Sequence, residues 1–269
     1  MIAYPFSKIN IGLQIVGKRE DGFHNLETIF YPIGLQDALE IVESKKFQFR
    51  TNRPELGSSK DNLVVKAYNL LKKDYNLPPV DIFLYKKIPA GAGLGGGSSD
   101  ASHTILMLDK IFCLGLNTEK KKKYALSLGS DCPFFIENKP VFATGRGELT
   151  EEIPIRLNNY HIIIVSPNTS ISTKEAYCNI SIKKDKCSLK EISQLPMEKW
   201  REKITNSFEE YVFTKYPEIE KIKNTLYKHG ACFSLMSGSG SSVYGIFNEK
   251  QKDIRSWFPE NYEVFQQNL

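Results

Sequence analysis

Hydrophobic positions in this chain of 269 residues follow two rhythms, and together they predict a mixture of strands and helices. Alternating or continuous apolar runs predict strands at residues 9–16, 26–31, 38–42, 46–51, 80–88, 141–144, 161–165, 231–236 and 243–247. Helical spacing predicts helices after 61, after 99, from 118 to 129, at 200–211 and at 218–229. Because strands and helices do not alternate strictly, the pattern favours an α+β fold.

A glycine-rich segment stands between the strand at 80–88 and the helix that follows it. Its residues are Pro89, Ala90, Gly91, Ala92, Gly93, Leu94, Gly95, Gly96, Gly97, Ser98 and Ser99. Five glycines in seven positions let the backbone adopt positive φ and approach a ligand closely. Since a helix starts directly afterwards, amides and the helix dipole converge on one point, which suits a polyphosphate. The two serine hydroxyls can add contacts to phosphate or to a metal ion.

Other kinds of glycine loop fit this segment less well. A Walker A loop needs a lysine near its end, and none stands there. Gly91, Gly93 and Gly96 match the dinucleotide-binding pattern GxGxxG, but the position for a ribose-binding acid falls inside the predicted helix, near Asp109. A protein-kinase loop would require later HRD and DFG motifs, which the sequence lacks. A flexible linker would not lead straight into an amphipathic helix.

The glycine segment resembles the ATP-binding motif of the galactokinase, homoserine kinase, mevalonate kinase and phosphomevalonate kinase superfamily. Further segments resemble one family within it, the kinases that act on 4-diphosphocytidyl-2-C-methyl-D-erythritol. These segments are 7–10 (SKIN), 18–24 (KREDGFH), 61–64 (DNLV), 128–135 (LGSDCPFF) and 237–241 (SGSGS). Two departures preserve shape or aromaticity: Phe6 and Ser7 stand where the family often has Pro-Ala, and Phe23 stands where a tyrosine is common.

The resemblance implies a two-lobed α+β kinase with its active site in the cleft between the lobes. It also implies an ATP-binding domain at residues 1–147 and a substrate-binding domain at 148–269. The implied reaction is ATP-dependent phosphorylation of the 2-hydroxyl of 4-diphosphocytidyl-2-C-methyl-D-erythritol in the non-mevalonate (methylerythritol phosphate) pathway to isoprenoid precursors. Mg²⁺ is expected to arrive with ATP, because magnesium usually binds through substrate phosphates and few protein groups.

The resemblance further implies two catalytic residues, Lys8 and Asp131. Asp131 precedes the apolar stretch 133–135, and a carboxylate beside apolar walls can take a proton from a substrate hydroxyl. Lys8 is implied to pair with this aspartate and the hydroxyl, and to offset negative charge on the transferred group. Without the resemblance, a loop aspartate and a surface lysine would be the default interpretations.

Substrate contacts are implied by the resemblance in both halves of the chain. Phe23 is expected to stack on one face of the cytosine, the segment around His24 to bond the base edge, and Thr173 and Tyr177 to supply the other face. The remaining implied substrate contacts are Asn10, Gly238 and Ser239, and the remaining implied ATP contacts are Asn62 and Lys86.

Composition adds few constraints. The net charge of +5 is spread along the chain, and its densest basic run, Lys120–Lys123, is typical of a solvated helix face, so nucleic-acid binding is not expected. An odd number of cysteines, five, without CxxC spacing indicates neither a disulfide framework nor a zinc site. The remaining histidines show no ligand spacing, so a protein-bound metal is not expected. Without a membrane-length apolar run or a targeting signal, we expect a cytoplasmic protein. We expect it to be a monomer or a weak homodimer.

Three other functions stay open on the sequence alone. One is another kinase of the same superfamily, of the homoserine or mevalonate type, but the segment Gly22–His24 favours an acceptor that carries a nucleobase. The second is a nicotinamide-dependent oxidoreductase, based on the GxGxxG match. The third is a non-catalytic nucleotide-binding module, which the presence of both Lys8 and Asp131 disfavours.

Overall fold

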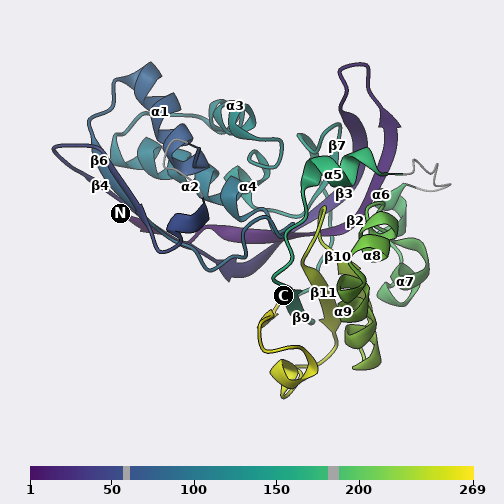
Figure 1. The fold of residues 1–269 in the computed structure, drawn as a ribbon. Helices are drawn as coiled ribbons and strands as arrows, with labels where there is room; N and C mark the ends of the chain where they lie inside the picture. Colours follow the sequence, from purple (N-terminus) through teal and green to yellow (C-terminus); the bar gives the residue numbers. More distant parts are fainter. Residues whose placement is uncertain (57–60, 181–187) are drawn as a thin grey trace. The chain divides into compact units, whose positions relative to one another are not determined.

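The computed structural model describes residues 1–56, 61–180 and 188–269, which form two compact units (Figure 1). Unit 1 comprises Met1–Ser7, Leu35–Ala90 and Gly95–Lys139, and unit 2 comprises Lys8–Gly34, Gly91–Leu94 and Pro140–Leu269. Each unit is therefore assembled from separate stretches of chain, and the glycine segment contributes to both. The division into an ATP-binding domain at residues 1–147 and a substrate-binding domain at 148–269 stays a prediction.

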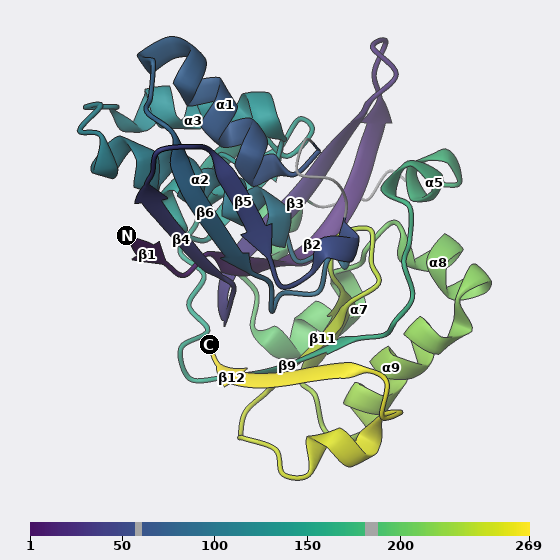
Figure 2. The same cartoon turned by 60° about the vertical axis from the view of Figure 1, so that its left-hand side comes forward.

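Within the described residues, unit 1 is built on a four-stranded sheet with the order β1-β4-β6-β5 (Figure 2). Its strands are β1 (Ile2–Ala3), β4 (Ala38–Glu43), β5 (Gln48–Thr51) and β6 (Val80–Tyr85). β4 pairs antiparallel with β1 and β6, whereas β5 pairs parallel with β6. A mixed sheet of this kind is not the parallel sheet of a dinucleotide-binding fold.

Helices pack on this sheet and on one another in unit 1. They are α1 (Leu63–Tyr75), α2 (Gly96–Ile111), α3 (Thr118–Leu128) and α4 (Phe134–Glu137), with a 3₁₀ turn at Pro54–Leu56. α1 begins where its pattern predicts, because the Asn62 side chain accepts a hydrogen bond from the Val64 amide at 2.9 Å. Leu71 of α1 and Leu108 of α2 are buried in one core with Ile82 of β6, and such packing stabilises helices of this length.

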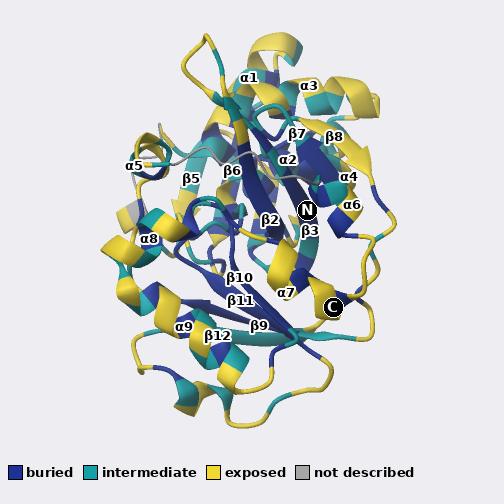
Figure 3. Cartoon of the chain, turned by 90° about the vertical axis from the view of Figure 1, so that its right-hand side faces the viewer, coloured by how far each residue is buried: buried dark blue, intermediate teal, exposed yellow. Residues whose placement is uncertain are grey.

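Unit 2 holds most of two further sheets. The first has the order β2-β3-β7-β8, and the second has the order β10-β11-β9-β12 with antiparallel pairing throughout. The strands are β2 (Phe6–Lys18), β3 (His24–Gln36), β7 (Val141–Thr144), β8 (Leu149–Glu152), β9 (His161–Ser166), β10 (Phe233–Met236), β11 (Val243–Phe247) and β12 (Glu263–Asn268). β9, β10 and β11 are buried along nearly their whole length, which explains their continuous apolar runs (Figure 3).

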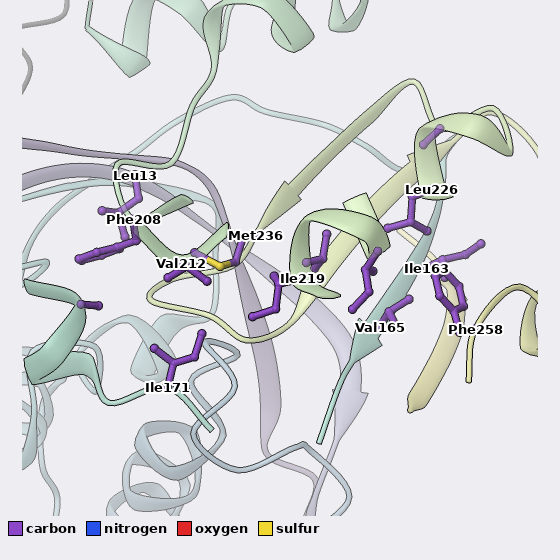
Figure 4. Close-up of a cluster of buried hydrophobic side chains, with 14 of the residues drawn as sticks. Leu13, Ile163, Val165, Ile171, Phe208, Val212, Ile219, Leu226, Met236 and Phe258 are labelled. Atoms are coloured by element: carbon purple, nitrogen blue, oxygen red, sulfur yellow. The ribbon is translucent and has the colours of Figure 1, made fainter. Parts of the chain in front are cut away.

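The core of unit 2 forms where helices α8 (Glu209–Lys215) and α9 (Pro217–Lys228) meet the second sheet. Ile219 and Leu226 of α9 pack in one cluster with Val165 of β9 (Figure 4). The remaining short elements are α5 (Thr173–Cys178), α6 (Leu189–Ile192), a 3₁₀ turn at Met197–Lys199, α7 (Trp200–Lys203) and a 3₁₀ turn at Ile254–Trp257. Across the described part of the chain, no helix combines the length and the apolar character required to cross a bilayer.

Two local predictions from the sequence were wrong. The helix expected at 200–211 is broken, because residues 205–207 pair with β2 instead: the Leu13 amide donates to the Thr205 carbonyl at 3.0 Å, and the Ser207 amide donates to the Leu13 carbonyl at 2.7 Å. In the helix predicted from 118 to 129, Thr118 has the position of a cap residue in the sequence, but the cap is Asn117, whose side chain accepts from the Lys120 amide at 2.9 Å.

Candidate functional site

The glycine segment is shorter as a loop than its sequence indicates, because α2 already begins at Gly96. Gly95 is the N-cap residue and lies in the left-handed region, with φ of 71° and ψ of 14°. Glycine has no side chain with which to cap the helix, so the first amides of α2 keep their capacity to bind an anion. This is the geometry expected of a phosphate-binding helix start.

Gly96 is required for packing rather than for loop flexibility. A Cβ atom at this position would lie 2.9 Å from the Ile88 side chain and 3.1 Å from the Lys86 ammonium nitrogen. The first residue of α2 therefore rests directly on the end of the preceding segment. A larger residue would push the start of α2 away from it.

The middle of the glycine segment, Gly91–Leu94, belongs to unit 2 and is held by the turn at 237–242. A Cβ at Gly93, whose φ is 79°, would lie 1.9 Å from the Ser237 carbonyl oxygen. The Ser237 hydroxyl donates to the Gly93 carbonyl at 2.9 Å, and the Ser242 amide donates to the Ala92 carbonyl at 3.2 Å. Gly238 also packs against this segment, since its Cβ would lie 3.2 Å from the Gly93 Cα. The two glycine motifs thus fit backbone to backbone.

Lys8 is a buried side chain and not a surface lysine. It is 3% exposed, its ammonium group donates to Asn10 Oδ1 at 2.6 Å, and it lies 4.9 Å from the centre of the Phe30 ring. Asn10 in turn donates to the Thr28 hydroxyl at 2.8 Å, and its backbone amide donates to the Ser237 hydroxyl at 3.2 Å. The two predicted residues on β2 therefore form one hydrogen-bonded group with an oriented cation.

Asp131 lies in unit 1, in the half-buried turn between α3 and α4. The turn is fixed by its neighbour Cys132, whose amide donates to the Gly129 carbonyl at 3.1 Å and whose carbonyl accepts from the Ser102 hydroxyl at 2.7 Å. Burial raises the pKa of the Cys132 thiol to about 11, so this cysteine is a neutral part of the wall. Phe134 and Phe135, predicted as apolar walls beside the carboxylate, are both buried, and their place beside the carboxylate stays a prediction.

The residues predicted to hold cytosine lie in unit 2, around the tip of the β2–β3 hairpin and α5. Phe23 is 53% exposed, and the guanidinium of Arg146 lies 4.9 Å from the centre of its ring. His24 and Tyr177 are stacked, with ring centroids 5.3 Å apart and an angle of 26°. A base cannot fit between rings that stack directly, so these two rings share one side of any bound base.

The start of α5 is joined to the turn at 237–242 by one hydrogen bond, between the hydroxyls of Thr173 and Ser239 at 3.1 Å. Gly238 of the same turn is held from the other direction by Asn206, whose side-chain amide donates to the Gly238 carbonyl at 2.8 Å. The sequence did not single out Asn206. An asparagine inside a predicted helix is the one signal that could have drawn attention to it.

The two residues predicted on the ATP side play visible structural parts in unit 1. The Asn62 side chain caps α1, as described above. Lys86 is buried, and its ammonium group donates to Asp37 and, at 2.7 Å, to Asp100. Neither aspartate was singled out by the sequence.

Other features of the described residues lie apart from these groups. A pocket of about 620 Å³ in unit 2 is lined by Tyr31–Gly34, Glu152–Arg156 and the end of β12, and none of the predicted site residues lines it. No cluster of three or more His, Cys, Asp or Glu side chains within 1–56, 61–180 and 188–269 is arranged to hold a metal ion.

Comparison with known families matches both halves of the chain. Residues 62–139 match the model described as GHMP kinases N terminal domain, and residues 188–264 match the model described as GHMP kinases C terminal. The first of these regions includes the glycine segment, α2 and the Asp131 turn.

Individual proteins resemble the chain over nearly its whole length. It is 49% identical to the 4-diphosphocytidyl-2-C-methyl-D-erythritol kinase of Bacteroides fragilis over 257 residues, which are 94% of each protein. A crystal structure of 4-(cytidine 5'-diphospho)-2C-methyl-D-erythritol kinase superposes with a TM-score of 0.82 at 27% identity, covering 100% of this chain and 99% of the other. The mevalonate kinase of Methanococcus jannaschii shares the fold, with a TM-score of 0.72 at 16% identity and coverage of 100% and 98%.

Proposed function

The chain belongs to the GHMP kinase family, and we propose that it uses ATP to phosphorylate the 2-hydroxyl of 4-diphosphocytidyl-2-C-methyl-D-erythritol. The observation that carries this choice of acceptor is the 49% identity to the Bacteroides fragilis kinase over 94% of both chains. The product would feed the non-mevalonate pathway to isoprenoid precursors. A homoserine or mevalonate acceptor is less well supported, because the mevalonate kinase shares the fold at only 16% identity.

We assign ATP to the start of α2. The support is local: Gly95 leaves the first helix amides uncapped, and Gly91, Gly93 and Gly95 all have positive φ, so backbone amides rather than side chains face the phosphates. Ser98 and Ser99 lie in the first turn, and both were predicted to add hydroxyl contacts, but the Ser99 side chain is fully buried beside His103. Mg²⁺ arrives with ATP and neutralises charge on its phosphates.

We assign the chemistry to Asp131 and Lys8. The Asp131 carboxylate takes the proton of the acceptor hydroxyl, the hydroxyl oxygen forms a bond to the γ-phosphorus, and the bond from that phosphorus to the β-γ bridging oxygen breaks to release ADP. Lys8 offsets the charge that gathers on the transferred group. Its burial and its bond to Asn10 support this part, because a preoriented cation stabilises developing charge better than a mobile one.

The cytosine is assigned to the side chains around the hairpin tip and α5. Phe23 offers an exposed ring face for stacking, and the His24–Tyr177 pair offers a second aromatic surface with ring nitrogens for the base edge. Thr173, Ser239, Gly238 and Asn10 complete the proposed acceptor contacts.

The proposed location is the cytoplasm and the proposed working form is a monomer or weak homodimer. The described cysteines, Cys113, Cys132, Cys178 and Cys232, are free thiols, as a reducing compartment produces, whereas Cys187 lies outside the described residues.

An assay of ADP release with a panel of acceptors tests the proposed reaction. The panel contains 4-diphosphocytidyl-2-C-methyl-D-erythritol, homoserine and mevalonate, and ³¹P NMR of the product locates the new phosphate. We expect turnover with the cytidine compound alone and a phosphate on its 2-hydroxyl. Faster turnover with another acceptor, or a phosphate elsewhere on the molecule, would overturn the proposal.

A further inference from the structure

Three charged side chains meet in the interior of unit 1, directly behind the start of α2. Asp37 comes from the turn between β3 and β4, Lys86 follows β6, and Asp100 lies in the second turn of α2. All three are nearly inaccessible to solvent: Asp37 is 1% exposed, Lys86 is 8% exposed and Asp100 is 2% exposed. Charged side chains are almost never buried so deeply unless they are paired with one another.

The three residues, named here the Asp37–Lys86–Asp100 cluster, connect segments that are far apart in sequence. The Lys86 ammonium donates to Oδ2 of Asp37 and, at 2.7 Å, to Oδ2 of Asp100. The second oxygen of Asp37 accepts from the backbone amides of Lys87 and Ile88, at 2.5 and 2.8 Å. Through these bonds the cluster connects two segments. Asp37 holds the stretch that leads into the glycine segment, and Asp100 belongs to the first turns of α2.

We propose that the Asp37–Lys86–Asp100 cluster positions the start of α2 for ATP, and that Lys86 acts on the nucleotide through this helix and not by contact. The contact that transmits the effect is visible at Gly96, where a Cβ would lie 3.1 Å from the Lys86 ammonium and 2.9 Å from Ile88. Because the first residue of α2 rests on these two side chains, a change in the cluster moves the amides that meet the phosphates. This inference rests on the assignment of ATP to the start of α2.

The charge balance of the cluster gives the proposal a second, independent readout. With all three groups ionised the cluster carries one surplus negative charge, and one buried oxygen of Asp100 has no hydrogen-bond partner among the described residues. Burial raises the pKa of the Asp100 carboxyl to about 7, the Lys86 ammonium opposes the rise, and the Asp37 carboxylate adds to it. His103, one turn further along α2, bonds the Ser99 carbonyl, and burial lowers the pKa of its imidazole.

The sign of the pH effect follows from this balance. A polyphosphate at the start of α2 repels an ionised Asp100 and so favours its protonated form. Raising the pH through 7 ionises the carboxyl and should weaken ATP binding in the parent protein. The Asp100→Asn side chain cannot ionise. The part of the pH dependence of ATP binding that comes from Asp100 should therefore be absent in this variant.

The experiment compares the parent with Lys86→Met, Asp100→Asn and the double variant, measuring Mg²⁺–AMP-PNP binding by calorimetry together with KM for both substrates and kcat from pH 6 to 8.5. We expect Lys86→Met to weaken nucleotide binding about tenfold or more, since small displacements of positioned groups are costly. KM for the acceptor should stay near the parent value. In the double variant the loss should be smaller than the product of the two single losses, because both residues act through one helix.

Asp109→Asn is the matched control, because Asp109 lies on the same helix and is paired with Lys121 at 2.7 Å, away from its start. This control should keep the parent's pH dependence. Losses by Lys86→Met that multiply fully with those of Asp100→Asn would show that the two residues act independently and would overturn the proposal. An Asp100→Asn variant that keeps the parent's pH dependence would overturn it as well. If Lys86→Met does not fold, the test rests on Asp100→Asn, whose side-chain oxygen can still accept a hydrogen bond from Lys86. The pH dependence of nucleotide binding in this variant and in the parent then decides.

A Gly95→Val variant measured alongside separates this inference from the assignment on which it rests. If Gly95→Val binds nucleotide normally, ATP does not bind at the start of α2. If Gly95→Val loses nucleotide binding while the cluster variants keep it, only the positioning role is wrong.

Discussion

At the start of α2, the groups proposed to hold ATP are backbone amides supported by side chains that solvent hardly reaches. Around the hairpin tip and α5, the groups proposed to hold cytosine are side chains that solvent reaches readily. Asp100, behind the first region, is 2% exposed, whereas Phe23, in the second, is 53% exposed. The first region is bonded through buried charges, and the second through ring contacts such as the His24–Tyr177 stack.

This difference suggests a division of labour between backbone and side chains. A polyphosphate needs positive potential and converging donors, which any helix start supplies once its backbone geometry is fixed. A nucleobase must be distinguished by its face and edge, which requires particular side chains at an accessible surface. The first region should therefore be sensitive to changes in backbone freedom, and the second to the removal of single rings.

The largest expected effect belongs to the chemistry proposed for Asp131 and Lys8. Asp131→Asn keeps the size and shape of the side chain but removes the proton acceptor, so kcat should fall by about 10²–10⁴-fold. Lys8→Ala should lower kcat comparably, because it removes the cation bonded to Asn10. Stopped assays of ADP release measure both.

The double variant Lys8→Ala/Asp131→Asn sharpens this test. Residues that act as a unit are strongly non-additive, so the double variant should be little worse than either single one. Two losses that multiply fully would mean that the residues act independently. An Asp131→Asn enzyme with most of its activity would leave catalysis to positioning and electrostatics alone.

The next largest effect should come from Gly95→Val. A β-branched residue at a φ of 71° is strained by about 1–2 kcal/mol, and its side chain also blocks the close approach of a phosphate. Together these should weaken ATP binding by at least about 100-fold, measured by calorimetry, with KM for the acceptor little changed. Gly115→Val is the matched control, because Gly115 has φ of 65° and open space for a Cβ. If both variants lost ATP binding equally, general destabilisation of the protein would explain the result.

Phe23→Ala tests the opposite region. Stacking a base on an aromatic ring is worth about 1–3 kcal/mol, so KM for the cytidine substrate should rise by about 5- to 150-fold while KM for ATP stays unchanged. Tyr4→Ala is a suitable control, since Tyr4 is an aromatic residue of similar exposure, 59%, in unit 1. If Phe23→Ala changed both KM values alike, Phe23 would not belong to the acceptor region.

Two kinds of sequence signal predicted parts of the fold: local residue patterns and the family resemblance. Local signals were sufficient for the start of α1, where Asn62 is a strong N-cap residue, and for the glycine segment, whose composition permits positive φ. The family resemblance identified the GHMP kinase fold, and the comparisons confirm it. The roles of individual site residues stay predictions until the variants are measured.

Long-range contacts explain what the sequence could not show. Asp37 and Lys86 are 49 residues apart, and nothing in their neighbourhoods indicates that they pair. The helix expected at 200–211 was wrong because pairing with Leu13 of β2 overrides helical spacing there. Gly96 looked like part of a flexible loop, but its lack of a side chain serves close packing on Ile88 and Lys86. In each case the deciding partner comes from a distant segment.

The smallest effect that still separates the two regions is expected from Arg146→Ala. The Arg146 guanidinium lies 4.9 Å from the centre of the Phe23 ring, and its side chain is 37% exposed. At such a site a cation–π contact is worth about 0.5–1 kcal/mol, so losing it should raise KM for the cytidine substrate by only about 2- to 5-fold.

The same change tests whether Arg146 acts only by steadying the Phe23 ring. If it does, Arg146→Ala should have no further effect once Phe23 is already alanine, and KM for ATP should not change in either background. Steady-state kinetics of the two single variants and the double variant measure this coupling. If Arg146→Ala has its full effect in the Phe23→Ala background, the guanidinium contacts the substrate itself. If Arg146→Ala changes KM for ATP, Arg146 does not act in the acceptor region alone.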